Sequence, residues 1–154
     1  MKTLLCSLVA FNLSVSAASA APPTLTNLEL ATKVREANSA INRRLSEAAG
    51  EIDFKGGTIT PKGSKLAVEA LDITLQTVDL IQSCPGILAT MEVRTPTEWA
   101  FLQRWFKERL AKYQALKGKD FSDVEDVFEQ TTYFDDDPAL TEFFRVYSTT
   151  VKHL

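Results

Sequence analysis

The sequence predicts an all-α protein. The expected architecture is a single bundle of four main helices plus one short helix, with a small β-hairpin at residues 52–60. Three observations favour this class: apolar residues recur every three or four positions along several segments, helix-start signals precede those segments, and glycine or proline follows them. The length of 154 residues suits one domain, because a domain averages roughly 150 residues.

Residues 1–20 are expected to be a cleaved signal peptide, which leaves residues 21–154 as the helical domain. Lys2 supplies a positive charge, an apolar run of about 12 residues follows, and Ala18-Ser19-Ala20 matches the small-x-small pattern of a signal peptidase site. A membrane-spanning helix needs about 20 apolar residues. The segment therefore predicts export to the periplasm or the extracellular space, with no membrane span after cleavage.

The first helix is expected to begin behind Thr26, which forms a capping box with Glu29, and to end at Gly50. Its apolar residues share one face because they recur at steps of three and four. They are Leu30, Val34, Ala37, Ile41, Leu45 and Ala48.

The next segment changes period. Residues 52–55 and 58–60 alternate in polarity around Gly56-Gly57, which indicates a hairpin. An isolated hairpin is marginally stable, so it must pack on the helices or remain an ordered loop.

The second helix is expected over residues 65–83, with Ser64 as its N-cap and Cys84-Pro85 as its end. Two of its three side-chain lines are apolar, and so wide an apolar face predicts a central helix that contacts at least two others. Residues 87–94 are too short to assign from their pattern alone, although one helical turn would fit.

Three later helix starts are visible. Thr95-Pro96 opens a helix that Gly118 ends, Ser122 is expected to cap a short helix, and Asp137-Pro138 opens the last one. The residues expected to face inward in these helices are Trp99, Leu102, Phe106, Leu110, Tyr113, Leu116, Val124, Val127, Phe128, Leu140, Phe143, Phe144, Tyr147 and Val151.

Charge is unevenly distributed. The formal net charge is −3, and this acidic balance argues against nucleic acid as a partner, because phosphate contacts require a surplus of lysine and arginine. Residues 94–119 contain seven basic side chains, whereas residues 120–137 contain eight acidic and no basic ones. Either the two segments neutralise each other, or the acidic segment faces a basic partner or a cation.

Few residues suggest catalysis. His153 is the only histidine, so a histidine-rich metal site is impossible, and the run Asp135 to Asp137 lacks the spacing of a calcium loop and fits helix capping better. Ser64 and Lys65 could hold an anion at a helix start, but the spacing of a phosphate-binding loop is absent. Cys84 is expected to be a buried free thiol, with a disulfide-linked dimer as the alternative. No cofactor or metal is predicted.

The sequence therefore favours an exported protein-binding module, such as an inhibitor, immunity protein or effector, without catalytic activity. It would act as a monomer or weak dimer. A small all-α enzyme that uses carboxylates and arginines, or a carrier of apolar ligands, are the alternatives. The residues expected to bind a protein partner are Phe101, Arg104 and Trp105 in an aromatic patch, and Asp123, Asp126, Asp135 and Asp136 in the acidic segment.

Overall fold

The computed structural model describes residues 25–94, 103, 107–108, 110–125, 127 and 138–154. The expected signal peptide lies outside these residues. The main elements are α1 (Asn27–Ala49), β1 (Ile52–Asp53), β2 (Thr58–Ile59), α2 (Pro61–Gln82), α3 (Pro85–Arg94) and α6 (Pro138–Lys152), and residues 110–116 are also helical. The prediction of an all-α fold with a small hairpin is confirmed.

The helix α1 begins as the sequence predicts. The Glu29 backbone N–H donates to Thr26 Oγ1 at 3.2 Å, and the Thr26 backbone N–H donates to Glu29 Oε2 at 2.8 Å, so the capping box is complete. Four residues of the expected apolar face are buried, whereas the remaining two, Ala37 and Leu45, are half-buried. Gly50 caps the end of the helix.

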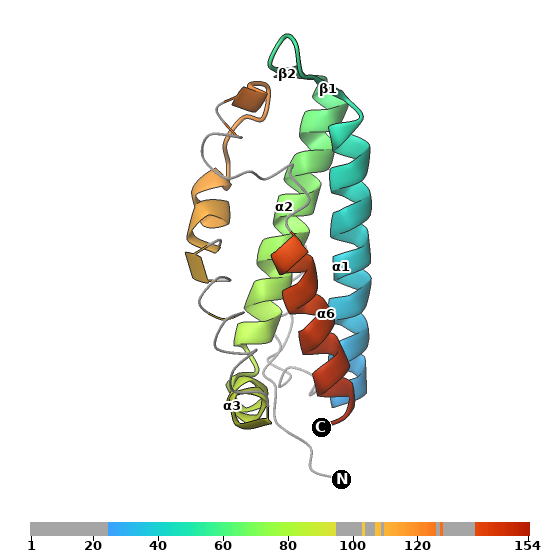
Figure 1. Cartoon of the computed structure of the whole chain (residues 1–154), viewed down its shortest axis with the longest axis vertical. Helices are drawn as coiled ribbons and strands as arrows, with labels where there is room; N and C mark the ends of the chain where they lie inside the picture. Colours follow the sequence, from blue (N-terminus) through green and yellow to red (C-terminus); the bar gives the residue numbers. More distant parts are fainter. Residues whose placement is uncertain (1–24, 95–102, 104–106, 109, 126, 128–137) are drawn as a thin grey trace, which may run out of the picture.

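The hairpin is also confirmed. β1 and β2 are antiparallel, with Ile52 opposite Ile59 and Asp53 opposite Thr58. Gly57 has a φ of +64°, a backbone conformation that glycine adopts without the steric cost of a side chain. The hairpin sits at the end of the bundle where α1 finishes and α2 begins (Figure 1).

The predicted start of α2 is wrong by four residues. The helix begins at Pro61, and its N-cap is Thr60, whose hydroxyl accepts a hydrogen bond from the Gly63 backbone N–H at 3.1 Å. Proline at the first helical position is favourable because its missing N–H would have no helical partner there. Ser64 is consequently inside the first turn, where its N–H donates to the Thr60 carbonyl.

The buried face of α2 includes two threonines that the apolar pattern does not indicate. Thr74 and Thr77 are 1% and 4% exposed. Their hydroxyls donate to the carbonyls of Ala70 and Ile73, at 2.8 and 2.7 Å, which satisfies them inside the core.

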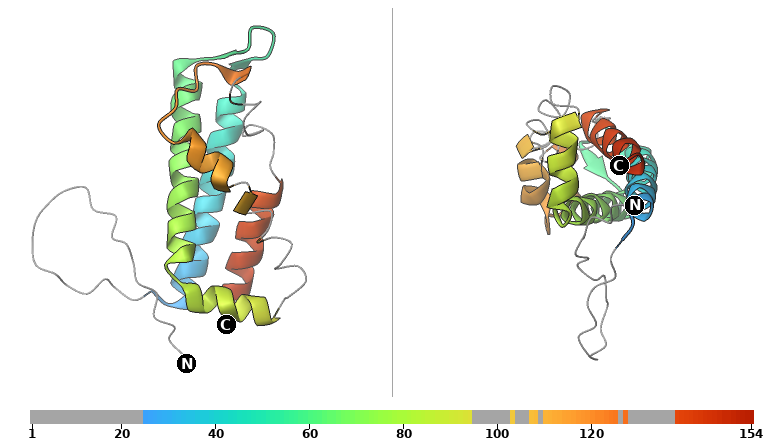
Figure 2. Two further views of the ribbon diagram at one scale, coloured as in Figure 1. Left: turned by 90° about the vertical axis from the view of Figure 1, so that its left-hand side faces the viewer. Right: turned by 90° about the horizontal axis from the view of Figure 1, so that it is seen from below.

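The long helices run side by side, and α3 closes one end of the bundle. α2 is antiparallel to α1, and α6 also packs along α1 (Figure 1). α3 lies across the end opposite the hairpin, and the segment that contains residues 110–116 lies beside α2 (Figure 2). The contacts of α1 with both α2 and α6 are extensive, so α1 shares the central role expected for α2.

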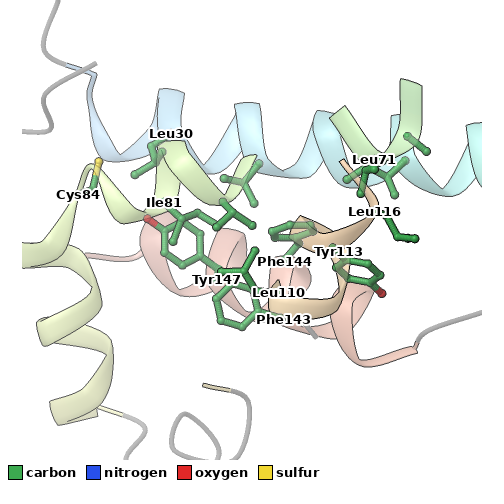
Figure 3. Packing of buried hydrophobic residues seen from close by; sticks show 14 of the residues in the cluster. Leu30, Leu71, Ile81, Cys84, Leu110, Tyr113, Leu116, Phe143, Phe144 and Tyr147 are labelled. Carbon is green, nitrogen blue, oxygen red and sulfur yellow. The ribbon is translucent and has the colours of Figure 1, made fainter. Parts of the chain in front are cut away.

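Aromatic side chains from α6 fill the core. Phe143, Phe144 and Tyr147 are each at most 2% exposed, and Leu110 and Leu116 from the neighbouring helical segment lie beside them (Figure 3). The rings of Phe143 and Phe144 meet edge to face, with centroids 5.8 Å apart.

The later helices agree with the sequence wherever they are described. Tyr113, Val124 and Val127 are buried as expected, and Gly118 has a φ of +77° just after the helical residues 110–116. Other predicted features lie outside the described residues. These are the caps Thr95-Pro96 and Asp137, and the inward-facing Trp99, Leu102, Phe106 and Phe128.

Cys84 is 1% exposed, which confirms its predicted burial. It is disulfide-bonded, however, so the expectation of a free thiol is wrong. The pattern of apolar residues around a cysteine predicts its burial, but it carries no information on whether a second sulfur is within reach.

Candidate functional site

One of the seven predicted partner-binding residues is described by the structure. Phe101, Arg104, Trp105, Asp126, Asp135 and Asp136 lie outside the described residues. Asp123 is described and exposed. Its surroundings therefore define the part of the predicted site that can be built from geometry.

Asp123 joins the acidic segment to the hairpin. It forms an isolated antiparallel bridge with Thr58, and the N–H of the next residue, Val124, donates to the Gly57 carbonyl at 3.1 Å. These backbone contacts place the start of the acidic segment against the outer edge of β2. Two parts of the chain more than sixty residues apart thus form one end of the molecule.

The sequence predicts Ser122 as the cap of the short helix, but Asp123 takes that role. Asp123 Oδ1, rather than the Ser122 hydroxyl, accepts a hydrogen bond from the Glu125 backbone N–H, at 3.0 Å. The Ser122 hydroxyl instead donates to Asp120 Oδ2 at 2.9 Å. Aspartate is as good a helix N-cap as serine, and here Asp123 accepts the hydrogen bond from the Glu125 N–H that the Ser122 hydroxyl was expected to accept.

An exposed aromatic ring stands at the tip of the hairpin. Phe54 is 72% exposed, and the turn that carries it is closed by a hydrogen bond from the Lys55 N–H to Asp53 Oδ1 at 3.0 Å. Phe54 is part of the alternation that predicts the hairpin, but no sequence pattern distinguishes it as a binding residue. Phe54 lies two positions before Gly56, so the sequence indicates the turn but not the exposure of the ring.

Carboxylates also lie near the glycines of this turn. A Cβ built on Gly57 would lie 3.9 Å from Glu125 Oε2, so the Glu125 side chain is near the turn. We define the hairpin end as Asp53, Phe54, Lys55, Asp123 and Glu125, all of which are exposed. It combines one large apolar side chain with three acidic groups and one basic group.

The base of the hairpin is fastened to α2. Lys62 Nζ donates to Glu51 Oε1 and the Thr60 hydroxyl donates to Glu51 Oε2, both at 2.7 Å. The hydrogen bond from Lys62, followed by that from Thr60, lowers the pKa of Glu51. The hairpin end is therefore presented on a fixed support.

The sequence suggests that Ser64 and Lys65 could hold an anion at a helix start. In the structure, a groove of about 360 Å³ lies beside these residues and the hairpin. Both residues line the groove, but Asp120 lines it too, and its carboxylate would repel an anion. Ser64 also lies within the first turn of α2 rather than at its N-cap. The structure thus argues against an anion site here.

The carboxylates with lowered pKa values are surface groups with structural partners. Hydrogen bonds from Thr26 lower the pKa of Glu29, and the hydrogen bond from Arg145 lowers the pKa of Glu142. Among the described residues, no group of three or more histidine, cysteine, aspartate or glutamate side chains could hold a metal ion. No described helix is both long and apolar enough to cross a membrane.

No family model, curated protein or solved structure matches this chain.

Proposed function

We propose that this protein is an exported helical module that binds a basic surface of a partner protein and has no catalytic activity of its own. The hairpin end is the proposed contact surface. The observation that carries the proposal is the exposure of Phe54 on a turn whose base is fixed by Glu51, Thr60 and Lys62. Binding hot spots are typically aromatic or arginine side chains that surrounding contacts shield from water, and Phe54 is the exposed aromatic side chain of the hairpin end.

The charge of the rim favours a basic partner. The hairpin end has three acidic residues, Asp53, Asp123 and Glu125, and one basic residue, Lys55. The nearby charges of Lys119 and Asp120 offset each other and do not change this balance. Complementary charges raise association rates and select the partner, and their effect falls as salt is added. The enzyme alternative needs charged groups that converge in a buried site, and the described carboxylates with lowered pKa values have exposed, structural roles instead.

The partner can be captured from the exported fraction and its affinity then measured with both proteins purified. Phe54→Ala is expected to weaken binding about thirtyfold, which corresponds to the roughly 2 kcal/mol that defines a hot spot. Leu28→Ala is the matched control, because Leu28 is also a large exposed apolar residue, 59% exposed, but lies at the other end of α1. Glu125→Lys should weaken binding and flatten its salt dependence. Equal affinity of the wild type and Phe54→Ala would disprove the proposal.

Export is tested separately by the N-terminal sequence of the native protein, which is expected to begin at Ala21. Cleavage there removes Cys6 and leaves Cys84 as the only cysteine. Cys6 is the only other cysteine of the chain, so an intrachain disulfide of Cys84 and cleavage after Ala20 exclude each other. Intact-mass measurement with and without reductant distinguishes a cleaved chain from one that retains both cysteines.

A further inference from the structure

A second groove lies at the other end of the bundle. It has a volume of about 300 Å³, near the lower limit of roughly 300–1,000 Å³ for small-molecule sites. The first turns of α1 form one wall, and the last turn of α6 forms the other. Because the two helices run in opposite directions, their contributing ends meet (Figure 1). The side chains that define its chemistry are Leu28, Thr32, Arg35, Thr149, Lys152 and His153.

The described lining of this groove is cationic. It contains the basic side chains Arg35 and Lys152 and no carboxylate. Within the described part of the chain, neither Arg35 nor Lys152 forms an ion pair. Both side chains are exposed, so their charges are available to a ligand.

The nearby carboxylates are already committed or point elsewhere. Glu29 accepts hydrogen bonds from Thr26, and Glu142 pairs with Arg145 one to two turns earlier in α6. Glu36 follows Arg35 directly, and adjacent positions on a helix do not face each other. Among the described residues, no side-chain carboxylate of α1 or α6 therefore cancels the positive charges of Arg35 and Lys152.

The remaining lining residues add two other kinds of contact. Thr32 and Thr149 supply hydroxyl groups, which can donate to an anionic oxygen. Leu28 is 59% exposed and Ala31 lies beside it on the same face of α1, so one part of the groove is apolar. Charge, hydroxyl and apolar surface are thus combined within one small groove.

We propose that the groove binds a small anion in which a carboxylate or phosphate group is attached to a short alkyl chain. The head group lies between Arg35 and Lys152, where the arginine fork can hold two of its oxygens. The alkyl chain covers Leu28. This site is independent of the hairpin end, which lies at the opposite end of α1.

Binding can be followed through His153, because it is the only histidine in the chain and lines the groove. The imidazole signals of the untagged protein are recorded by NMR during titration with octyl phosphate, octanoate, inorganic phosphate and neutral octyl glucoside, below micelle concentrations. We expect the imidazole signals to shift saturably with octyl phosphate, octanoate or both. The ligand that binds with the higher affinity identifies the preferred head group. Inorganic phosphate should bind at least tenfold more weakly, and octyl glucoside should give no saturable shift.

Variants assign the contacts. The double variant Arg35→Gln with Lys152→Gln should weaken the alkyl anion at least tenfold, whereas Arg43→Gln should leave its affinity unchanged. Arg43 is the matched control because it lies two turns further along the same face of α1 and outside this groove. Leu28→Ala should weaken the binding of octyl phosphate but not the binding of inorganic phosphate. The proposal is overturned if no alkyl anion gives a saturable shift, if the double variant binds like the wild type, or if octyl glucoside binds equally well.

Discussion

Gly63 in α2 lies against Glu51 so closely that a Cβ on the glycine would be 2.6 Å from the Glu51 Cβ. The same atom would lie 2.7 Å from Ile59 Cγ1. Both distances are shorter than atoms can tolerate, and neither neighbour is the end of a flexible side chain. The absence of a side chain at position 63 therefore allows the hairpin to pack on the first turn of α2.

Gly63→Ala is predicted to destabilise the protein by about 1–3 kcal/mol, because the added methyl group forces the hairpin away from α2. Gly50→Ala is the control. Its φ is −67° and its nearest contact would be 3.4 Å from the Glu47 carbonyl oxygen, so we expect no loss and a gain of up to about 1 kcal/mol. Urea unfolding of both variants measures the difference, and equal stabilities would contradict the steric argument.

Tyr147→Phe is predicted to raise stability by about 1 kcal/mol. Tyr147 is fully buried, and its hydroxyl has no hydrogen-bond partner among the described residues, which leaves a desolvated polar group in the core. For a protein of this size, thermal unfolding should shift upward by about 2–4 °C. A lower melting temperature for the variant would mean that the hydroxyl has a partner in solution.

The same residue predicts an alkaline effect. Burial raises the pKa of Tyr147 above its ordinary value of 10.0, so the folded state holds the phenolic proton more tightly than the unfolded state. As the pH rises above the unfolded pKa, the unfolded state loses this proton first, so the free energy of unfolding falls. The free energy of unfolding should therefore fall less steeply above about pH 10 in Tyr147→Phe than in the wild type.

The ion pair between Arg44 of α1 and Glu69 of α2 is predicted to contribute little. Arg44 Nε and Glu69 Oε2 are 2.6 Å apart, but Nε does not meet the geometry of a hydrogen bond. The side chains are 29% and 37% exposed, so water and salt screen the attraction. A double-mutant cycle with Arg44→Gln and Glu69→Gln should give a coupling energy of about 0.2–1 kcal/mol that falls at high salt.

Glu51→Gln is predicted to reduce acid sensitivity. The pKa of Glu51 is lowered in the folded state by the hydrogen bond from Lys62 and then by that from Thr60, so its contribution is present above the unfolded pKa of about 4.5. That contribution is lost as the pH falls through the lowered pKa. Chemical unfolding between about pH 6 and pH 3 should show a shallower loss of stability in Glu51→Gln than in Glu36→Gln, an exposed control on α1.

The sequence predicts most of the fold because its local signals agree with the tertiary structure. Thr26 and Glu29 cap α1, and Gly118 follows the helical residues 110–116. The described apolar residues expected to face inward in α6 are buried, namely Phe143, Phe144, Tyr147 and Val151. The start of α2 was misplaced because Thr60 continues the alternation of the hairpin and also caps the helix. A residue that serves two elements cannot be assigned from one period alone.

The site was less predictable. Aromatic density pointed to Phe101 and Trp105, whereas the exposed aromatic residue of the described chain is Phe54. Exposure depends on which surfaces the other segments cover, and no local pattern records that. Asp123 was chosen for its charge, but its bridge to Thr58 is a long-range pairing that only the folded chain reveals.

The bridge between Thr58 and Asp123 also bears on the order of folding. α1, the hairpin and α2 are consecutive in the chain, so their contacts form by closing short loops. The bridge closes a loop of more than sixty residues, so forming it costs more chain entropy. The packing of the helical residues 110–116 against the bundle must offset this cost. The hairpin itself therefore needs only neighbours in the chain, whereas the hairpin end is complete only once the segment that contains residues 110–116 has docked.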